Sequence, residues 1–341
     1  MSKWNILITG IAGFIGFHIA KTLLNEYGCV NVIGIDNLNE YYDPEIKRGR
    51  LSVLGIEHKD TEYDYPTDSK VYNGLNFIKM DIGDLNSLDA LFRQENFDVV
   101  IHLAAQAGVR YSRENPQLYI DSNITGFLNI LECCKKNPPK HLLYASSSSV
   151  YGVNKKMPFV ETDVADAPVS LYGATKKMNE AMADIYAYQN GIRISGLRFF
   201  TAYGEWSRPD MALFLFTKRI LNGSAIELYN YGNMARDFTY VGDIAKGIVK
   251  LLPHMPAEIS SHELYNIGFG QSVTLTRLVQ ELESTLGKKA KIELLPMQPG
   301  DVPVTHADTG KLYRTIGYKP ETSISEGVKK FVDWYRWYYK Q

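Results

Sequence analysis

The chain of 341 residues is 45% hydrophobic and 22% charged, and its formal net charge is −1 at pH 7. This length exceeds one typical core, so we expect one large domain with a satellite, or two domains. The near-zero net charge and the lack of a basic block argue against binding to nucleic acid or to an anionic membrane through overall charge.

The cysteine content indicates the cellular compartment. Cys29, Cys133 and Cys134 are odd in number and two of them are adjacent, which is unlike a disulfide framework. The sequence holds no Cys-x-x-Cys pair and no histidine cluster at zinc-ligand spacing, so we expect no structural metal. The first apolar run, residues 4–9, is too short for a secretory signal core, and no apolar stretch reaches bilayer-spanning length. We therefore expect a cytoplasmic protein that is not inserted in a membrane.

Apolar runs alternate with amphipathic segments through the first two-thirds of the chain. The runs interpreted as short buried strands are residues 6–9, 30–36, 75–79, 99–103, 141–146 and 194–200. The helical patterns between them are residues 14–26, 85–94, 119–135 and 172–189. This alternation predicts an α/β fold built on a doubly wound parallel sheet with helices on both faces.

Glycines follow the first predicted strand and open the first predicted helix. Gly10 permits a tight turn, Gly13 lets backbone N–H groups approach a pyrophosphate, and Gly16 allows the helix to pack closely on the strand. Asp36 ends the second strand, where its carboxylate can accept both adenosine ribose hydroxyls and would repel a 2′-phosphate. The pattern predicts NAD rather than NADP. A glycine turn that binds no cofactor is the alternative.

Residues 38–73 form a polar, tyrosine-rich segment that breaks the alternation. We interpret it as an insertion, partly helical around residues 44–54 and followed by a long loop. Two roles stay open for this insertion: a solvent-exposed loop, or a cover over the cofactor or a partner.

Tyr172 and Lys176 lie four residues apart in an amphipathic segment, which places both on one helix face. A free tyrosine has a pKa of about 10 and is a poor base at neutral pH. A nearby ammonium and the positive nicotinamide ring favour the phenolate, so the pair is suited to hydride exchange with a substrate. The run from Ser146 to Ser149 adds weight, because four hydroxyls fill a core poorly but can line a polar site at the carboxyl edge of a sheet. A serine-rich loop is the alternative.

The character of the sequence changes after residue 200. The expected elements are a loop at 201–210, helices at 211–221 and 240–251, an edge strand at 226–231, a strand–helix–strand set at 264–268, 274–286 and 292–295, and an aromatic helix at 324–339. We expect residues 1–200 to form the NAD-binding domain, with 236–253 packing back on it. Residues 201–235 and 254–341 are then a smaller α/β substrate lobe, with a ligand cleft between the two parts.

Several specific motifs are distributed along nearly the whole chain. They are the glycine loop, Asp81-Ile82 after a strand, His102-Leu-Ala-Ala-Gln106, Asn123 in the following helix, a Ser-Ser-Val-Tyr-Gly run ending at Gly152, and Tyr172-x-x-x-Lys176. With these motifs the chain resembles the extended short-chain dehydrogenases, specifically the nucleotide-sugar epimerases. The resemblance implies a Rossmann-like sheet with a smaller C-terminal α/β lobe, bound NAD and a UDP-sugar substrate.

The resemblance also implies roles for individual residues. Asp81 and Ile82 would flank the adenine, Phe199 would lie near the nicotinamide, and Ser147 would bind the sugar O4 beside Tyr172. The residues expected to bind the cofactor are Gly10, Gly13, Phe14, Ile15, Gly16, Asp36, Asn37, Asp81, Ile82, Leu103, Ala104, Ala105, Asn123, Tyr172, Lys176 and Phe199. Tyr172, Lys176 and Ser147 are the expected catalytic residues.

Within the family, the residues at two positions, Ser148 and Ser149 here, distinguish one reaction from another. Sugar-nucleotide 4,6-dehydratases carry Asp-Glu at the positions of Ser148 and Ser149, and UDP-glucuronate decarboxylases typically carry Glu at the second. Both positions are serine in this chain, so neither dehydration nor decarboxylation is well supported. The run from Arg198 to Ala212 resembles the signature of UDP-glucuronate 4-epimerases, with Thr201 where neutral-sugar 4-epimerases usually have asparagine.

Hydroxyl and guanidinium donors suit the carboxylate of a uronic acid. The resemblance further implies that Arg236 binds the diphosphate, that Asp301 meets the uridine and that Tyr229 stacks near the uracil. The residues expected to bind the substrate are Ser147, Ser148, Ser149, Tyr172, Thr201, Arg208, Tyr229, Arg236 and Asp301.

The predicted reaction is C4 epimerisation of UDP-glucuronate to UDP-galacturonate through a transient 4-keto sugar, with Tyr172 removing and returning the O4 proton. The alternatives are a UDP-glucose or UDP-N-acetylglucosamine 4-epimerase, a UDP-glucuronate decarboxylase, and a non-catalytic NAD-binding protein. By resemblance we also expect a homodimer through the helices at 119–135 and 172–189, whose apolar residues could instead cover the smaller lobe.

Overall fold

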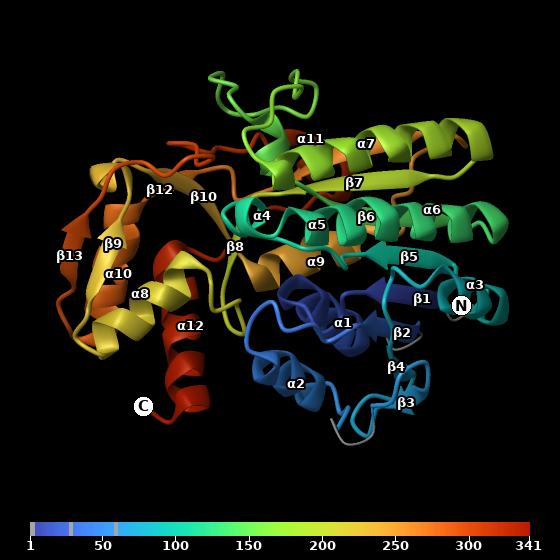
Figure 1. The fold of residues 1–341 in the computed structure, drawn as a ribbon, viewed down its shortest axis with the longest axis horizontal. Helices are drawn as coiled ribbons and strands as arrows, with labels where there is room; N and C mark the ends of the chain where they lie inside the picture. Colours follow the sequence, from blue (N-terminus) through green and yellow to red (C-terminus); the bar gives the residue numbers. More distant parts are fainter. Residues whose placement is uncertain (1–3, 27–29, 58–60) are drawn as a thin grey trace.

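A computed structural model describes residues 4–26, 30–57 and 61–341 of the chain, so Cys29 lies outside the described residues. Its main feature is an eight-stranded sheet in the order β11-β7-β6-β5-β1-β2-β4-β3 (Figure 1). The strands are β1 (Trp4–Thr9), β2 (Val30–Asp36), β3 (Pro66–Asp68), β4 (Leu75–Lys79), β5 (Val99–His102), β6 (His141–Ser147), β7 (Ile194–Phe199) and β11 (His262–Ile267). The neighbours pair in parallel except for β3, which runs antiparallel to β4. The predicted doubly wound sheet is confirmed.

Alternation along the strands distributes the core over both faces of the sheet. In β1, Ile6 and Ile8 join the cluster that includes helices α1 (Phe14–Glu26) and α9 (Val241–Leu251). Leu7 points to the other face, where α3 (Leu85–Glu95), α6 (Gly126–Lys136) and α7 (Leu171–Asn190) contribute to a second cluster. Successive side chains of a strand point to opposite faces, so each buried strand anchors both helix layers.

The helix that carries the predicted catalytic pair has clear start and stop signals. The hydroxyl of Ser170 accepts a hydrogen bond from the backbone N–H of Gly173 at 3.0 Å, which caps the first turn of α7. Gly191 ends the helix with φ of 68°, a left-handed conformation that glycine adopts without strain. These caps fix Tyr172 in the first turn of the helix.

The predicted helix at 119–135 is not one regular helix. The chain forms the short helices α4 (Tyr111–Glu114) and α5 (Pro116–Tyr119), a π-helical segment η2 (Ile120–Thr125) and then α6. The π-helical segment holds Asn123, whose side chain is buried against the backbone of Gln106. A hydrophobic period cannot reveal this change of winding, because it depends on contacts with a distant loop.

The insertion contains more regular structure than the sequence predicts. Helix α2 (Pro44–Val53) occupies the expected helical part and is capped by Asp43. The segment expected to be a long loop contains the edge strand β3, which reads Pro-Thr-Asp and has no apolar pattern.

The smaller lobe lies beside the large sheet, at the left of Figure 1. It contains a sheet of β8 (Thr201–Tyr203), β10 (Ala235–Tyr240) and β12 (Ser272–Thr274), a pair of β9 (Ala225–Leu228) and β13 (Lys291–Leu294), and helices α8 (Ala212–Leu221), α10 (Leu275–Leu286) and α12 (Ile324–Tyr339). Helix α11 (Gly310–Ile316), also expected in this lobe, instead packs against β11 and α9 on the large sheet. Three strands in the smaller lobe were not predicted. β8 occupies the expected loop, and β12 lies just before the expected helix at 274–286. β10 reads Ala-Arg-Asp-Phe-Thr-Tyr, a polar sequence that does not indicate a buried strand.

One predicted boundary differs from the observed topology. β11 was expected in the smaller lobe, but it pairs in parallel with β7 at the edge of the large sheet. Helix α9 packs against α1. In the described ranges, no helix is long and apolar enough to cross a membrane.

Candidate active site

A cavity opens at the carboxyl edge of the large sheet, walled by residues that follow β1, β2, β5, β6 and β7. Many of the predicted site residues meet there. They are Gly10, Gly13, Phe14, Ile15, Gly16, Asp36, Asn37, Ile82, Leu103, Ala104, Ala105, Ser147, Ser148, Ser149, Tyr172, Lys176, Phe199, Thr201 and Arg208. Asp81, Asn123, Tyr229, Arg236 and Asp301 lie outside this wall. The site residues therefore fall into one main cavity and a set of positions beside it.

The glycine loop is packed so closely that side chains are excluded. Gly10 has φ of +74°, and a Cβ there would lie 2.7 Å from the backbone nitrogen of Ala104. A Cβ on Gly16 would lie 2.2 Å from the carbonyl oxygen of Gly10. The loop therefore turns directly into α1 beside the segment after β5. A bare backbone at a helix N-terminus fits the pyrophosphate of a dinucleotide.

Asp36 lies at the end of β2, as predicted, and it has an unpredicted neighbour. One carboxylate oxygen accepts a hydrogen bond from the N–H of Leu38 at 2.8 Å. The ammonium of Lys47, from α2, lies 3.7 Å from the same oxygen and also lines the cavity. A lysine in a predicted amphipathic helix carries no signal of such a role, because its contact depends on how α2 packs.

Two predicted cofactor residues act through their neighbours. Asp81 accepts a hydrogen bond from the side-chain amide of Asn37 at 2.8 Å, so it positions a cavity residue. Asn123 binds the backbone of Gln106 through its oxygen at 2.8 Å and its nitrogen at 3.0 Å, and the nitrogen also donates to Thr175. Asn123 thus supports the cavity wall, and its expected contact with the cofactor stays a prediction.

Tyr172 and Lys176 both line the cavity, and burial is the largest influence on the pKa of each. Burial raises the pKa of Tyr172, while a hydrogen bond with Ser147 and the charge of Arg208 act to lower it. Burial lowers the pKa of Lys176 to about 7, and its amine donates to the carbonyl of Ala145 at 2.9 Å. In the protein alone, desolvation of the phenolate is the largest effect on the pKa of Tyr172. The expected shift towards the phenolate includes the charge of the nicotinamide ring and stays a prediction.

The third position on the same face of α7 is Glu180, which anchors the helix. Its carboxylate accepts two hydrogen bonds from Arg198 on β7, at 2.8 and 2.9 Å, and one from the hydroxyl of Ser146 at 2.7 Å. Both ends of this ion pair are almost fully buried. Ser146 thus fixes α7 to β6, and it also lines the cavity together with Ser147, Ser148 and Ser149.

Arg208 and Thr201 line the cavity from the segment after β7. The guanidinium of Arg208 is held by the carboxylate of Asp210. Tyr41 from the insertion also lines this wall. The short hydroxyls, the guanidinium and the phenol of Tyr172 together form a polar pocket that can hold an acidic sugar and exchange a proton with it.

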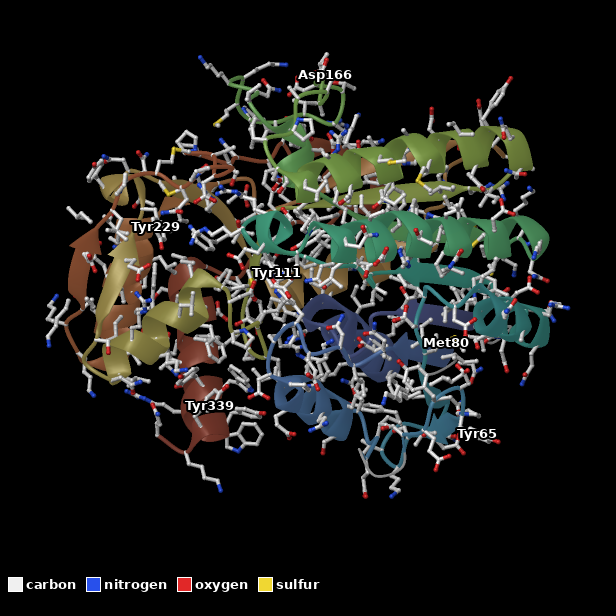
Figure 2. All side chains as sticks on the ribbon, viewed as in Figure 1. Tyr65, Met80, Tyr111, Asp166, Tyr229 and Tyr339 are labelled. Atoms are coloured by element: carbon white, nitrogen blue, oxygen red, sulfur yellow. The ribbon has the colours of Figure 1, made fainter. Side chains whose placement is uncertain are left out.

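The remaining predicted substrate residues gather in a second cluster with Arg110, which the sequence did not single out. The guanidinium of Arg110 lies 3.0 Å from a carboxylate oxygen of Asp301 and 4.3 Å from the ring centroid of Tyr229. Burial lowers the pKa of Arg236, and the charge of Asp301 opposes that effect. Figure 2 shows Tyr229 on the smaller lobe. We call Arg110, Tyr229, Arg236 and Asp301 the outer cluster.

Comparison with known proteins identifies the family. The model described as NAD dependent epimerase/dehydratase family matches residues 6–268. UDP-glucuronate 4-epimerase 4 of Arabidopsis thaliana is 45% identical over 98% of this chain and 76% of its own length. A probable UDP-glucuronate 4-epimerase of Rhizobium meliloti is 43% identical over 98% of both chains.

Among solved structures, UDP-glucuronic acid 4-epimerase of Bacillus cereus in complex with UDP-glucuronic acid and NAD aligns with a TM-score of 0.87. It is 32% identical, and the alignment covers 98% of this chain and 100% of that one.

Proposed function

This chain belongs to the NAD dependent epimerase/dehydratase family, and we propose that it interconverts UDP-glucuronate and UDP-galacturonate by epimerisation at C4 with NAD as its cofactor. One observation carries the proposal. The hydroxyls of Ser148, Ser149 and Thr201 and the guanidinium of Arg208 line the same cavity as Tyr172. These donors suit the carboxylate of a uronic acid. The relatives named for this reaction align along nearly all of the chain.

The cavity supports binding of NAD at its glycine-loop end. The backbone after β1 offers N–H groups to the pyrophosphate, and the carboxylate of Asp36 offers acceptors to the adenosine ribose. Bound NAD would supply the hydride exchange at C4 of the sugar that epimerisation requires. The residues of the chain then have three tasks: to hold the sugar, to move the O4 proton and to keep water out.

Tyr172 is proposed to take the O4 proton and to give it back. In the protein alone its hydroxyl stays protonated, because burial raises its pKa, so little phenolate is present to accept a proton. Positive charge near a phenol favours the phenolate, and the charge of Arg208 already acts in that direction. The hydroxyl of Ser147, which bonds to Tyr172, is the proposed second contact of O4.

The donors around the sugar carboxylate would also protect the 4-keto intermediate from decarboxylation. A 4-keto uronic acid is a β-keto acid, and such acids lose CO2 when the carboxylate can turn out of the plane of the carbonyl. Several hydrogen bonds from Thr201, Ser148 and Ser149 would hold that group in one orientation. Neither serine can act as the acid or base that dehydration requires.

The outer cluster is proposed to hold the UDP part of the substrate. Arg110 and Arg236 bring two positive charges against one negative charge on Asp301. This excess suits a diphosphate, and Tyr229 offers a ring to the uracil. The large sheet and its helices would then bind NAD and the smaller lobe the nucleotide of the substrate.

We further propose a cytoplasmic homodimer. Apolar side chains on α6 and α7 are exposed, among them Leu128 at 38%, Met178 at 50% and Ile185 at 52%. Pairing of these two helices with a second copy would cover them. Cys133 and Cys134 are free thiols, which suits a reducing compartment.

The reaction is tested by incubating the purified protein with UDP-glucuronate and following the anomeric protons by NMR. Anomeric signals of UDP-galacturonate are expected, and no signals of the decarboxylated sugar. Release of CO2, or conversion of UDP-glucose without conversion of UDP-glucuronate, would sink the proposal.

Tyr172→Phe tests the assigned base. Removal of the hydroxyl is expected to lower turnover at least about 100-fold, because general acid–base catalysis contributes that much or more. NAD should remain bound, since the ring still packs in place. Turnover is measured by NMR and bound NAD by its release on denaturation. Ordinary activity in this variant would refute the role of Tyr172.

A further inference from the structure

We propose that Tyr41 is a positioning residue for the substrate, whose hydroxyl fixes the carboxylate of Asp210 and thereby aims Arg208 at the sugar carboxylate. The inference rests on the proposed function, because it assigns a helper to Arg208 in that site. It also gives the insertion a role in recognition, since Tyr41 precedes α2 and lines the cavity.

The contact between Arg208 and Asp210 is two-pronged. Nε of Arg208 lies 2.9 Å from Oδ1 of Asp210, and Nη2 lies 3.0 Å from Oδ2. A guanidinium has five N–H groups in a rigid fork. The carboxylate of Asp210 therefore decides where the remaining N–H groups point. Whatever fixes Asp210 also fixes the direction in which Arg208 can meet a ligand.

Tyr41 supplies the third contact of this carboxylate. Its hydroxyl donates to Oδ2 of Asp210 at 3.0 Å. The side chain of Asp210 is 36% exposed, so without that contact water would compete for it and the carboxylate could turn. The guanidinium of Arg208 also lies 5.9 Å from the ring centroid of Tyr41. Tyr41 therefore contacts both members of the ion pair.

The fold makes room for the hydroxyl of Tyr41 at a glycine. Gly108 has φ of +103°, a conformation that side chains rarely allow, and a Cβ there would lie 2.5 Å from the hydroxyl oxygen of Tyr41. On its other side the ring of Tyr41 packs against Tyr111, with 4.7 Å between the centroids. Figure 2 shows Tyr111 at the centre of the molecule, between the large sheet and the smaller lobe. The position of Tyr41 is thus specified by the residues around it.

A buried arginine ties together the two segments that carry Tyr41 and Arg208. The guanidinium of Arg50 donates to the hydroxyl of Tyr42 at 2.7 Å and to the carbonyl of Trp206 at 2.6 Å. Tyr42 follows Tyr41 directly, and Trp206 precedes Arg208 by two residues. The same arginine donates to Ala12 in the glycine loop. The insertion and the sugar-binding segment are therefore fixed relative to each other.

The charges explain why direction matters here. Burial alone would raise the pKa of the Asp210 carboxyl, but the charge and hydrogen bonds of Arg208 hold it below its ordinary value. Both partners are therefore charged, and their net charge is zero. A neutral pair attracts a ligand carboxylate weakly at a distance, so recognition depends on correctly aimed N–H groups. Loss of the Tyr41 hydroxyl should affect acidic sugars and leave neutral ones alone.

The test is Tyr41→Phe in the holoenzyme. KM for UDP-glucuronate is expected to rise about three- to tenfold, the effect of one hydrogen bond, with kcat within about twofold of the wild type. The inhibition constant of UDP-glucose, which lacks the carboxylate, should not change. Tyr65→Phe is the matched control: Tyr65 is 67% exposed on the same insertion, and this variant should behave as the wild type.

A second variant makes the test independent of the ring. Asp210→Asn removes the charged acceptor, so Tyr41→Phe should have less than about a twofold further effect on KM in that background. Additive effects of the two changes, an unchanged KM in Tyr41→Phe, or an equal loss of affinity for UDP-glucose would each overturn the role of Tyr41. A wild type that does not convert UDP-glucuronate would instead overturn the proposed function, and this inference with it.

Discussion

Burial controls the protonation of Lys176. Lys176 is 3% exposed, and desolvation lowers its pKa from 10.5 to about 7. Below pH 7 both the folded and the unfolded chain hold this proton, and the folded state carries the full cost of a buried charge. Between pH 7 and 10.5 the unfolded chain holds more protons on this side chain than the folded one. Its effect on stability therefore becomes more favourable as pH rises through that window.

A comparison with Lys176→Met isolates this effect, because the other titrating groups are shared. Between pH 7 and 9 the free energy of unfolding of the NAD-free wild type should rise relative to the variant by about 1–3 kcal/mol. Urea denaturation at both pH values measures it. A parallel pH dependence of the two proteins would contradict a depressed pKa at this lysine.

At the residue scale, spacing and chemistry predicted that Tyr172, Lys176 and the serines from Ser147 to Ser149 lie in one site, and they line one cavity. The direction of the Tyr172 pKa was not predictable, because it depends on how closely α7 packs on β6. Lys47 was missed for a related reason: a lysine in an amphipathic helix is usually solvated, and only the docking of α2 brings it to 3.7 Å from Asp36.

The close contact between the glycine loop and α1 can be tested by substitution. In Gly16→Ala the new Cβ would lie 2.2 Å from the carbonyl oxygen of Gly10, so the loop and the helix must separate. The purified variant should contain less than about one-tenth of the NAD of the wild type, because even a small shift of backbone N–H groups disrupts pyrophosphate binding. The NAD released on denaturation is measured by absorbance.

Gly247→Ala is the matched control for this change. Gly247 lies in α9, and a Cβ there would meet the ring of Tyr318 at an ordinary 3.6 Å. This variant should keep its NAD and gain about 0.5–1 kcal/mol of stability, as expected for alanine inside a helix. An equal loss of NAD in both variants would show that the loop contact is not the cause.

At the scale of elements, strongly apolar strands and capped helices were predictable, and α1 has the predicted bounds. The strand β10 was not, because its core positions include Asp237 and Thr239. Asp237 is satisfied by backbone N–H groups of Phe269, Gly270 and Ala307. A buried carboxylate whose partners come from distant loops resembles a turn when only the sequence is known.

At the scale of the whole molecule, the division into a large sheet and a smaller lobe followed from the sequence, but the path of the chain between them did not. β11 pairs with the large sheet although it follows β8, β9 and β10 of the smaller lobe in the chain. Its sequence pattern does not show which of the two sheets it joins. The contact of Arg110 with Asp301, which joins residues 191 positions apart, was hidden for the same reason.

Arg110 belongs to the segment after β5, whereas Tyr229 and Asp301 belong to later parts of the chain, so a ligand in the outer cluster would bridge the two parts of the molecule. Arg110→Gln should therefore weaken binding of UDP, UDP-glucose and UDP-glucuronate alike, by about three- to tenfold, and leave NAD content unchanged. Calorimetric titration of the holoenzyme with each ligand measures this. Arg113→Gln, an exposed arginine on α4, should have no effect. A loss confined to UDP-glucuronate would assign Arg110 to the sugar carboxylate instead, because only contacts with the nucleotide are common to all three ligands.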